Sequence, residues 1–235
     1  MLLVLLLRLQ GGHRPSSAAR LSRWWLRRLL RILHLRLRIL GTPLPGPRLL
    51  VCNHVSWLDI PVIGAVELTR FVSKAEVRDW PLVGWLAYAP GTFYLKRGAG
   101  GTRELVAALA AHLPHGNVAL FPEGTTSTGE HVLRFTPRLF AAAIEAGCPV
   151  QPVALRYGPA ADGSRIAPFV GDDTLVSHLW RLLREPELEV ELIFCAPLAT
   201  AGAERAALAE TARAAVAAAV EGRLSVACYP SQLAA

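Results

Sequence analysis

Short apolar runs that resemble β-strands alternate with helical segments along most of this chain, and this alternation limits the possible fold more than any other feature. It is typical of an α/β domain with a mixed, largely parallel central sheet flanked by helices. In such folds, ligands bind in loops at the carboxyl ends of strands. The strand-like runs are Leu49–Cys52, Phe71–Ser73, Thr92–Leu95, Val118–Phe121, Val150–Leu155 and Leu188–Phe194. Helices are expected at about Trp57–Leu68, Pro81–Tyr88, Arg103–Leu113, Pro137–Ala146 and Ala203–Gly222.

Positive charge is concentrated near the N-terminus. The formal net charge is +7, and residues 1–48 contain ten arginines and no acidic residue. Between Arg20 and Leu40, leucine, isoleucine and tryptophan occupy the broad side opposite a basic stripe. We therefore expect one amphipathic helix over Arg20–Leu40, followed by a linker at Gly41–Pro47. The basic stripe consists of Arg20, Arg23, Arg27, Arg31, His34 and Arg38.

This pattern divides the chain into a basic, membrane-associated segment at residues 1–47 and a globular domain at residues 48–235. An amphipathic helix of this kind can lie in the lipid headgroup layer, with arginines near phosphates and tryptophans at the interface. It could also pack on its own domain. A nucleic-acid partner is not expected, because the apolar side is broad and rich in leucine. No apolar run reaches the roughly 20 residues that span a bilayer.

The four cysteines give no sign of a metal centre. Cys52, Cys148, Cys195 and Cys228 are far apart and form no C-x-x-C pair. This spacing argues against a zinc site and against a disulfide framework. No metal site is therefore expected.

A histidine and an aspartate follow the strand-like run that ends at Cys52. On a regular helix, His54 and Asp59 would diverge by about 140°, so they can meet only if the helix begins between them. Ser56 is a candidate helix cap, with Asp59 at capping-box spacing. Asp59 could then accept a hydrogen bond from one imidazole nitrogen and leave the other free to take a proton. A structural histidine beside a capping aspartate would have the same sequence.

Two further blocks follow or end strand-like runs. Phe121–Ser127 (FPEGTTS) combines a glycine turn with hydroxyl groups, which suits an anion or hydroxyl site, although ordinary turns share this composition. Gly91–Arg97 (GTFYLKR) ends in two cations, and the planar guanidinium of Arg97 matches phosphate geometry. A solvated strand end would look similar. The only two lysines of the chain, Lys74 and Lys96, lie in this region.

Taken in order, these blocks resemble motifs of the glycerolipid acyltransferase superfamily, specifically bacterial 1-acyl-glycerol-3-phosphate acyltransferases. The clear resemblance covers roughly residues 48–157, with weaker similarity to about Pro197. Several ordered motifs at such separations form a specific signal. The matching segments are NHVSWLD at Asn53–Asp59, FVSKAE at Phe71–Glu76, GTFYLKR at Gly91–Arg97, FPEGTTS at Phe121–Ser127 and VQPVAL at Val150–Leu155.

The resemblance implies transfer of a fatty acyl group from a thioester to the sn-2 hydroxyl of 1-acyl-sn-glycerol-3-phosphate, giving phosphatidic acid. His54 would be the general base and Asp59 would orient it. Acyl-CoA or acyl carrier protein would be the co-substrate, and no cofactor is expected. The enzyme would lie peripherally or shallowly inserted on the cytoplasmic face of a bacterial inner membrane, with membrane lipids as partners. The implied substrate-binding residues are Lys74, Gly91, Phe93, Arg97, Phe121, Pro122, Glu123, Gly124, Thr125 and Pro152.

Within this set, Arg97, Glu123 and Gly124 would bind the glycerol-phosphate head of the acceptor. Because a carboxylate repels phosphate, Glu123 is expected to hold a glycerol hydroxyl or to position Arg97. Lys74 would bind phosphate or neutralise the developing oxyanion.

Three alternatives remain open. The segment Asp162–Asp173, with Thr174–Leu183, is similar to a branch that includes lyso-ornithine lipid acyltransferases, whose zwitterionic acceptor headgroup lacks phosphate. A non-catalytic, peripheral lipid-binding protein could use the same scaffold. A covalent route through Cys52 or Ser56 is conceivable, although the resemblance implies direct attack within a ternary complex.

Overall fold

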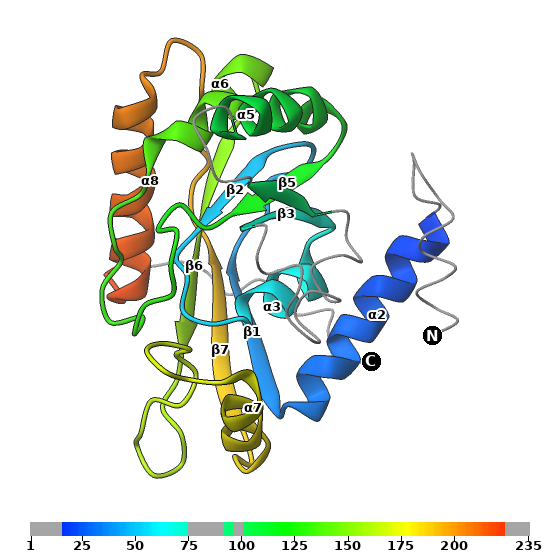
Figure 1. The fold of residues 1–235 in the computed structure, drawn as a ribbon, viewed down its shortest axis with the longest axis vertical. Helices are drawn as coiled ribbons and strands as arrows, with labels where there is room; N and C mark the ends of the chain where they lie inside the picture. Colours follow the sequence, from blue (N-terminus) through cyan, green and yellow to red (C-terminus); the bar gives the residue numbers. More distant parts are fainter. Residues whose placement is uncertain (1–15, 75–91, 96–100, 224–235) are drawn as a thin grey trace.

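A seven-stranded sheet forms the centre of the computed structural model, which describes residues 16–74, 92–95 and 101–223 (Figure 1). The strand order is β1-β7-β6-β2-β5-β3-β4. Strands β6, β2, β5, β3 and β4 are parallel, whereas β7 is antiparallel to β6 and parallel to β1. The predicted α/β class, with a mixed and largely parallel sheet, is confirmed. The strands are β1 (Leu35–Gly41), β2 (Leu49–Cys52), β3 (Thr69–Lys74), β4 (Phe93–Leu95), β5 (Asn117–Leu120), β6 (Val150–Tyr157) and β7 (Leu188–Phe194).

Helices cover both faces of this sheet because successive strand residues point to opposite sides. Leu50 and Cys52 of β2 join one buried cluster, and Leu49 and Val51 join the other. The first cluster is covered by α2 (Ser16–Ile32), α3 (Asp59–Val66) and α7 (Leu175–Leu183). The second is covered by α5 (Gly101–His112), α6 (Ala141–Ala146), α8 (Arg205–Val220) and the short 3₁₀ helices η2 (Leu113–His115) and η3 (Pro137–Phe140).

The elements expected after residue 48 are present wherever the structure describes the chain. The expected helix at about Pro81–Tyr88 lies outside the described residues. Helix α7 was not expected. It begins with a capping box, in which Thr174 Oγ1 accepts from the Ser177 N–H at 3.2 Å and Ser177 Oγ accepts from the Thr174 N–H at 3.3 Å.

The expectation of one helix from Arg20 to Leu40 was wrong. Helix α2 ends at Ile32, His34 adopts a left-handed φ of 53°, and Leu35–Gly41 forms β1 at the sheet edge. Over residues 35–41 the pattern has a period of two as well as a helical one. Pairing with β7 favours the strand, because Leu35, Leu37 and Ile39 then share one face and pack in the core, while Arg36 and Arg38 lie on the other face.

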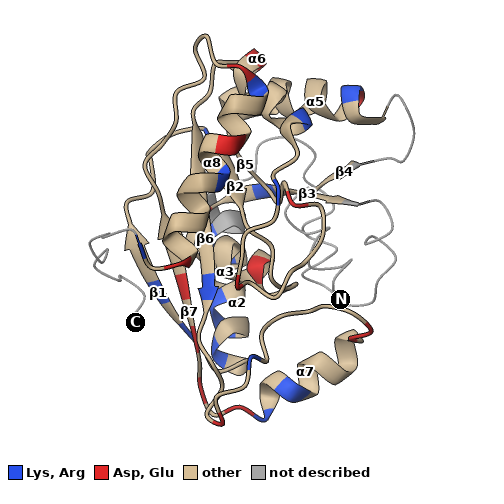
Figure 2. Ribbon diagram, turned by 90° about the vertical axis from the view of Figure 1, so that its left-hand side faces the viewer, with Lys and Arg blue, Asp and Glu red and all other residues tan. Residues whose placement is uncertain are grey.

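The arginines of β1 pair with acidic side chains of β7 and with Glu187, just before it. Figure 2 marks the basic positions of β1 in blue and the acidic positions of β7 in red. Arg36 Nη1 lies 3.4 Å from Glu187 Oε1, and Arg38 Nη1 lies 3.2 Å from Glu191 Oε1. Arg36 lies outside the basic stripe expected for a helix, whereas in the strand it lies on the same face as Arg38.

Helix α2 packs on the domain through its leucines and leaves a mixed row exposed. Leu30 is buried in the cluster shared with α3, and Arg27 Nε donates to the Ala65 carbonyl at 3.3 Å. The outward row includes Trp24, Arg28 and Ile32. Part of the expected basic stripe therefore faces protein. Among the described residues, no helix combines the length and apolar character needed to cross a membrane.

Candidate active site

The structure brings His54 and Asp59 into direct contact. His54 lies in the loop after β2, and α3 begins at Asp59, so the helix starts between them as their spacing requires. His54 Nδ1 lies 2.7 Å from Asp59 Oδ2. The same oxygen accepts the backbone N–H groups of Val55 at 2.8 Å and Ser56 at 3.0 Å. The Asp59 side chain is fully buried, whereas that of His54 is 20% exposed, so the imidazole is the accessible member of the pair.

The Ser56 hydroxyl does not cap the helix as expected. The N-cap residue of α3 is Leu58, which makes no side-chain capping bond, and the buried Ser56 Oγ finds no partner among the described residues. Only the other half of the capping box is present, because Asp59 reaches back to the Ser56 N–H. The carboxylate thus organises the loop that carries His54.

Strand β6 fixes this loop through residues that the sequence did not single out. Asn53 Nδ2 donates to the Leu155 carbonyl at 2.9 Å, and Asn53 Oδ1 accepts from the Leu155 N–H at 2.8 Å. Two residues further along, the Tyr157 hydroxyl donates to Asp59 Oδ1 at 2.8 Å. Because ligand sites lie at the carboxyl ends of parallel strands, a polar residue at the end of the β6 run was a usable signal.

The Phe121–Ser127 loop forms one wall of the site. The rings of Phe121 and His54 stack with centroids 4.1 Å apart and planes inclined by 15°. The Ser127 N–H donates to the His54 carbonyl at 2.8 Å, and Glu123 Oε1 accepts from the His54 N–H at 3.4 Å. Gly124 closes the turn with a φ of 73° and donates its N–H to the Phe121 carbonyl at 3.1 Å. The structure therefore places Phe121, Glu123 and Gly124 beside His54.

Glu123 has an unusual acidity at this position. Burial raises its pKa to about 7 and the nearby Asp59 carboxylate adds to the rise, while the hydrogen bond from the His54 N–H opposes it. Near neutral pH, a substantial fraction of Glu123 therefore carries a proton. A protonated carboxyl group can donate to a hydroxyl or phosphate oxygen without the repulsion that a carboxylate would cause.

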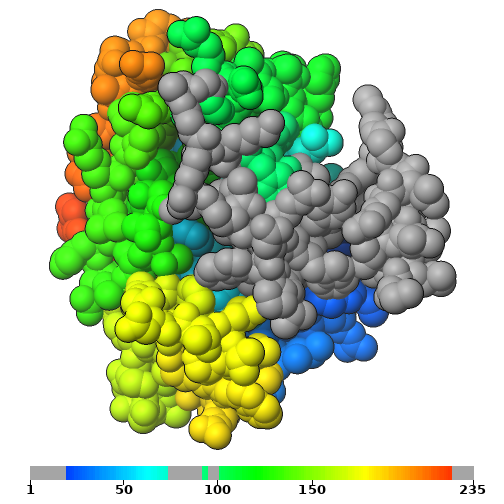
Figure 3. Space-filling view, in the orientation of Figure 1, coloured from blue at the N-terminus to red at the C-terminus, as the bar shows by residue number. Residues whose placement is uncertain are grey.

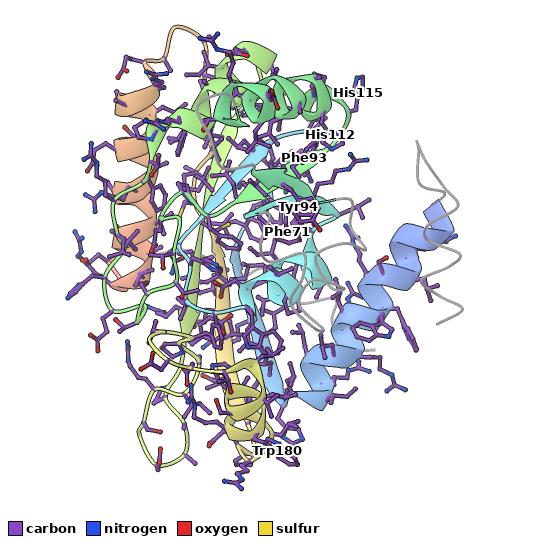
Figure 4. All side chains as sticks on the ribbon, viewed as in Figure 1. Phe71, Phe93, Tyr94, His112, His115 and Trp180 are labelled. Atoms are coloured by element: carbon purple, nitrogen blue, oxygen red, sulfur yellow. The ribbon has the colours of Figure 1, made fainter. Side chains whose placement is uncertain are left out.

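Other expected substrate-binding residues contact the protein framework. Phe93 packs beside His112, with ring centroids 5.5 Å apart, under α5 (Figure 4). Pro152 is buried within β6, and its carbonyl accepts from the Cys195 N–H at 3.0 Å. Pro122 is also buried, and its carbonyl accepts from the Thr136 N–H at 2.9 Å.

The remaining expected residues are placed only in part. Thr125 is exposed on the loop beside Glu123. Lys74 ends β3, next to β4, but its side chain lies outside the described residues, as do Gly91 and Arg97.

The two candidate nucleophiles for a covalent route are inaccessible. Cys52 and Ser56 are each 0% exposed. Burial, together with the Asp59 charge, raises the pKa of the Cys52 thiol well above its ordinary value, which disfavours the reactive thiolate. Neither side chain is therefore placed to act as a nucleophile.

The site thus consists of a histidine–aspartate pair at the carboxyl ends of parallel strands, with the FPEGTTS loop packed beside it. The chain belongs to the acyltransferase family, whose model, described as "Acyltransferase", matches residues 37–156. Its relatives place it within the glycerolipid acyltransferase family.

One relative is a lyso-ornithine lipid O-acyltransferase of Pseudomonas aeruginosa, which is 47% identical over 89% of this chain and 81% of its own length. Another is a 1-acyl-sn-glycerol-3-phosphate acyltransferase of Neisseria gonorrhoeae, which is 36% identical over 70% of this chain and 66% of its own length. The crystal structure of the 1-acyl-sn-glycerophosphate acyltransferase PlsC from Thermotoga maritima shares the fold. Its TM-score is 0.70 at 23% identity, over 94% of this chain and 86% of that chain.

Proposed function

We propose that the protein transfers a fatty acyl group from acyl-CoA or acyl carrier protein to the hydroxyl of a lyso-ornithine lipid. The observation that supports this chemistry is the bond from His54 Nδ1 to Asp59 Oδ2, at 2.7 Å. Asp59 orients the ring, and the other ring nitrogen accepts the proton of the acceptor hydroxyl. The hydroxyl oxygen attacks the thioester carbonyl and the carbon–sulfur bond breaks. His54 then returns the proton to the departing thiolate.

The similarity to known proteins favours this acceptor. Relatives named lyso-ornithine lipid O-acyltransferase are 47% and 40% identical over 89% and 88% of the chain. The Neisseria relatives named 1-acyl-sn-glycerol-3-phosphate acyltransferase are 36% identical over 70% of it. Lysophosphatidate is the second candidate, because the motif order resembles that of enzymes that use it. A partly protonated Glu123 is compatible with either headgroup.

The acceptor can be tested by competition. Purified protein in lipid vesicles would receive a labelled acyl thioester with equal amounts of lyso-ornithine lipid and lysophosphatidate, and acyl-CoA and acyl carrier protein would be compared as donors. We expect labelled ornithine lipid to predominate. If phosphatidic acid predominates, the proposed acyl transfer stands but its acceptor is lysophosphatidate. Folded protein that acylates neither lipid would favour a non-catalytic lipid-binding role.

We also propose that the outer face of α2 holds the enzyme on the cytoplasmic face of the inner membrane. Atoms of this N-terminal part of the chain are visible at the surface in blue (Figure 3). His34, after the end of α2, lies with its Nδ1 2.8 Å from the carbonyl oxygen of Glu185, after the end of α7. Exposed Trp24 and Ile32 can enter the headgroup layer while arginines contact phosphates. A hollow of about 280 Å³ is lined by Arg20, Arg23, Trp24, Arg27, Arg28 and Arg31.

Changing Arg20, Arg28 and Arg31 together to glutamine is expected to weaken binding to anionic vesicles about 100-fold. The reason is that each arginine near such a surface contributes about 1 kcal/mol. Vesicle sedimentation at several salt concentrations would measure the change. The matched control removes three exposed arginines from the opposite face of the sheet, Arg103, Arg138 and Arg205. Equal losses in both triple variants would show that only net charge matters.

A further inference from the structure

We propose that Tyr157 is a positioning residue for the reaction: its hydroxyl fixes the Asp59 carboxylate in the orientation that holds His54. The inference rests on the proposed catalytic roles of His54 and Asp59. Tyr157 does not need to touch the substrate, since it would act through Asp59.

The distribution of hydrogen bonds on Asp59 gives Tyr157 this role. One carboxylate oxygen, Oδ2, receives His54 Nδ1 at 2.7 Å and the N–H groups of Val55 and Ser56. The other oxygen, Oδ1, receives Tyr157 at 2.8 Å, and no other described residue donates to it. Three donors on one oxygen would still allow the carboxylate to pivot about that oxygen. The fourth donor, on the opposite oxygen, opposes this pivot.

Tyr157 is itself held firmly. It is the last residue of β6, 98 residues from Asp59 in the chain, and it pairs with Val190 of β7. Asn53 clamps both backbone groups of Leu155, two residues earlier, to the loop that carries His54. The Tyr157 ring packs against the buried cluster beneath α2 and α3. The hydroxyl therefore reaches Asp59 from a fixed strand.

The chemistry of the phenol suits a permanent donor. Burial, followed by the Asp59 charge and the hydrogen bond to Asp59, raises the pKa of Tyr157 well above its ordinary value, so the hydroxyl keeps its proton. The other described titratable groups that interact with Asp59 are His54, Glu123 and Cys52. Because the pKa values of Glu123 and Cys52 are also raised, neither adds a full negative charge at neutral pH.

Tyr157→Phe tests the proposal because phenylalanine keeps the ring and removes only the donor. We expect kcat to fall about 10- to 100-fold, with KM for both substrates little changed. Losses of this size are found when a hydrogen bond that orients a metal-binding histidine is removed, and Tyr157 would act on Asp59 in a similar way. A loss confined to kcat, with both KM values unchanged, is the result that general loosening of the fold would not give. Thr69→Val is the control. It removes another buried hydroxyl, bonded to the Arg70 carbonyl at 3.2 Å, at the start of β3, and it should leave activity unchanged.

A double variant distinguishes positioning from general packing. If Tyr157 acts through Asp59, the variant carrying Tyr157→Phe and Asp59→Asn should be no slower than Asp59→Asn alone. Losses that multiply would overturn the inference, and so would a Tyr157→Phe variant within about twofold of wild type in kcat. Wild type and His54→Ala are assayed in parallel. An inactive wild type or an active His54→Ala variant would refute the proposed function, whereas the first two results refute only the role of Tyr157.

Discussion

Asp59→Ala is expected to abolish acyl transfer and to lower the free energy of unfolding by about 3 to 5 kcal/mol. The carboxylate accepts bonds from His54 Nδ1, the N–H groups of Val55 and Ser56, and the Tyr157 hydroxyl. Alanine would leave these groups without their acceptor in a fully buried site. Urea unfolding measures the stability, and labelled acyl transfer measures the activity.

Two matched variants separate these effects. Asp59→Asn keeps the size of the side chain, so it should cost less stability, but turnover should still fall about 10⁴-fold because the ring loses its orienting charge. Asp173→Ala breaks a partly exposed pair with Arg181, in which the arginine side chain is 37% and the aspartate side chain 19% exposed. It should cost no more than about 1 kcal/mol and leave turnover intact. An Asp59→Ala protein as stable as Asp173→Ala would contradict the account.

Apart from α7, the described strands and helices after residue 48 could be predicted because their hydrophobic patterns are local. Strand β1 could not, because Arg20–Leu40 fits a helix equally well and the outcome depends on a distant partner. That partner is β7, about 150 positions later, where Glu189 and Glu191 alternate with apolar residues as the arginines of β1 do. Complementary alternation in the two segments was the available signal.

The difference between local patterns and distant partners also explains which parts of the site could be predicted. His54 and Asp59 are five positions apart, so their meeting follows from where one helix begins. The contacts of Asn53 and Tyr157 depend on β6 lying beside β2. No local sequence pattern predicts the order of strands in the sheet. The apposition of Phe121 to His54 likewise follows from the pairing of β2 with β5.

His54→Ala is expected to slow turnover at least about 1000-fold, because it removes the base that Asp59 orients. Stability should change by only about 1 kcal/mol, since Asp59 keeps its bonds to Val55, Ser56 and Tyr157. Binding to vesicles should be unchanged, because the proposed membrane face lies on α2. Measuring turnover, stability and vesicle binding together therefore distinguishes loss of the catalytic base from unfolding of the protein.

The most direct measurement of the central claim is the rate of labelled acyl transfer to lipid by wild type and His54→Ala in the same vesicles. Circular dichroism and vesicle binding would be recorded on the same preparations. We expect wild type to form acylated lipid and a folded, vesicle-bound His54→Ala protein to be at least about 1000-fold slower. A folded variant that retains transfer within about tenfold of wild type would contradict the assignment of His54 as the base.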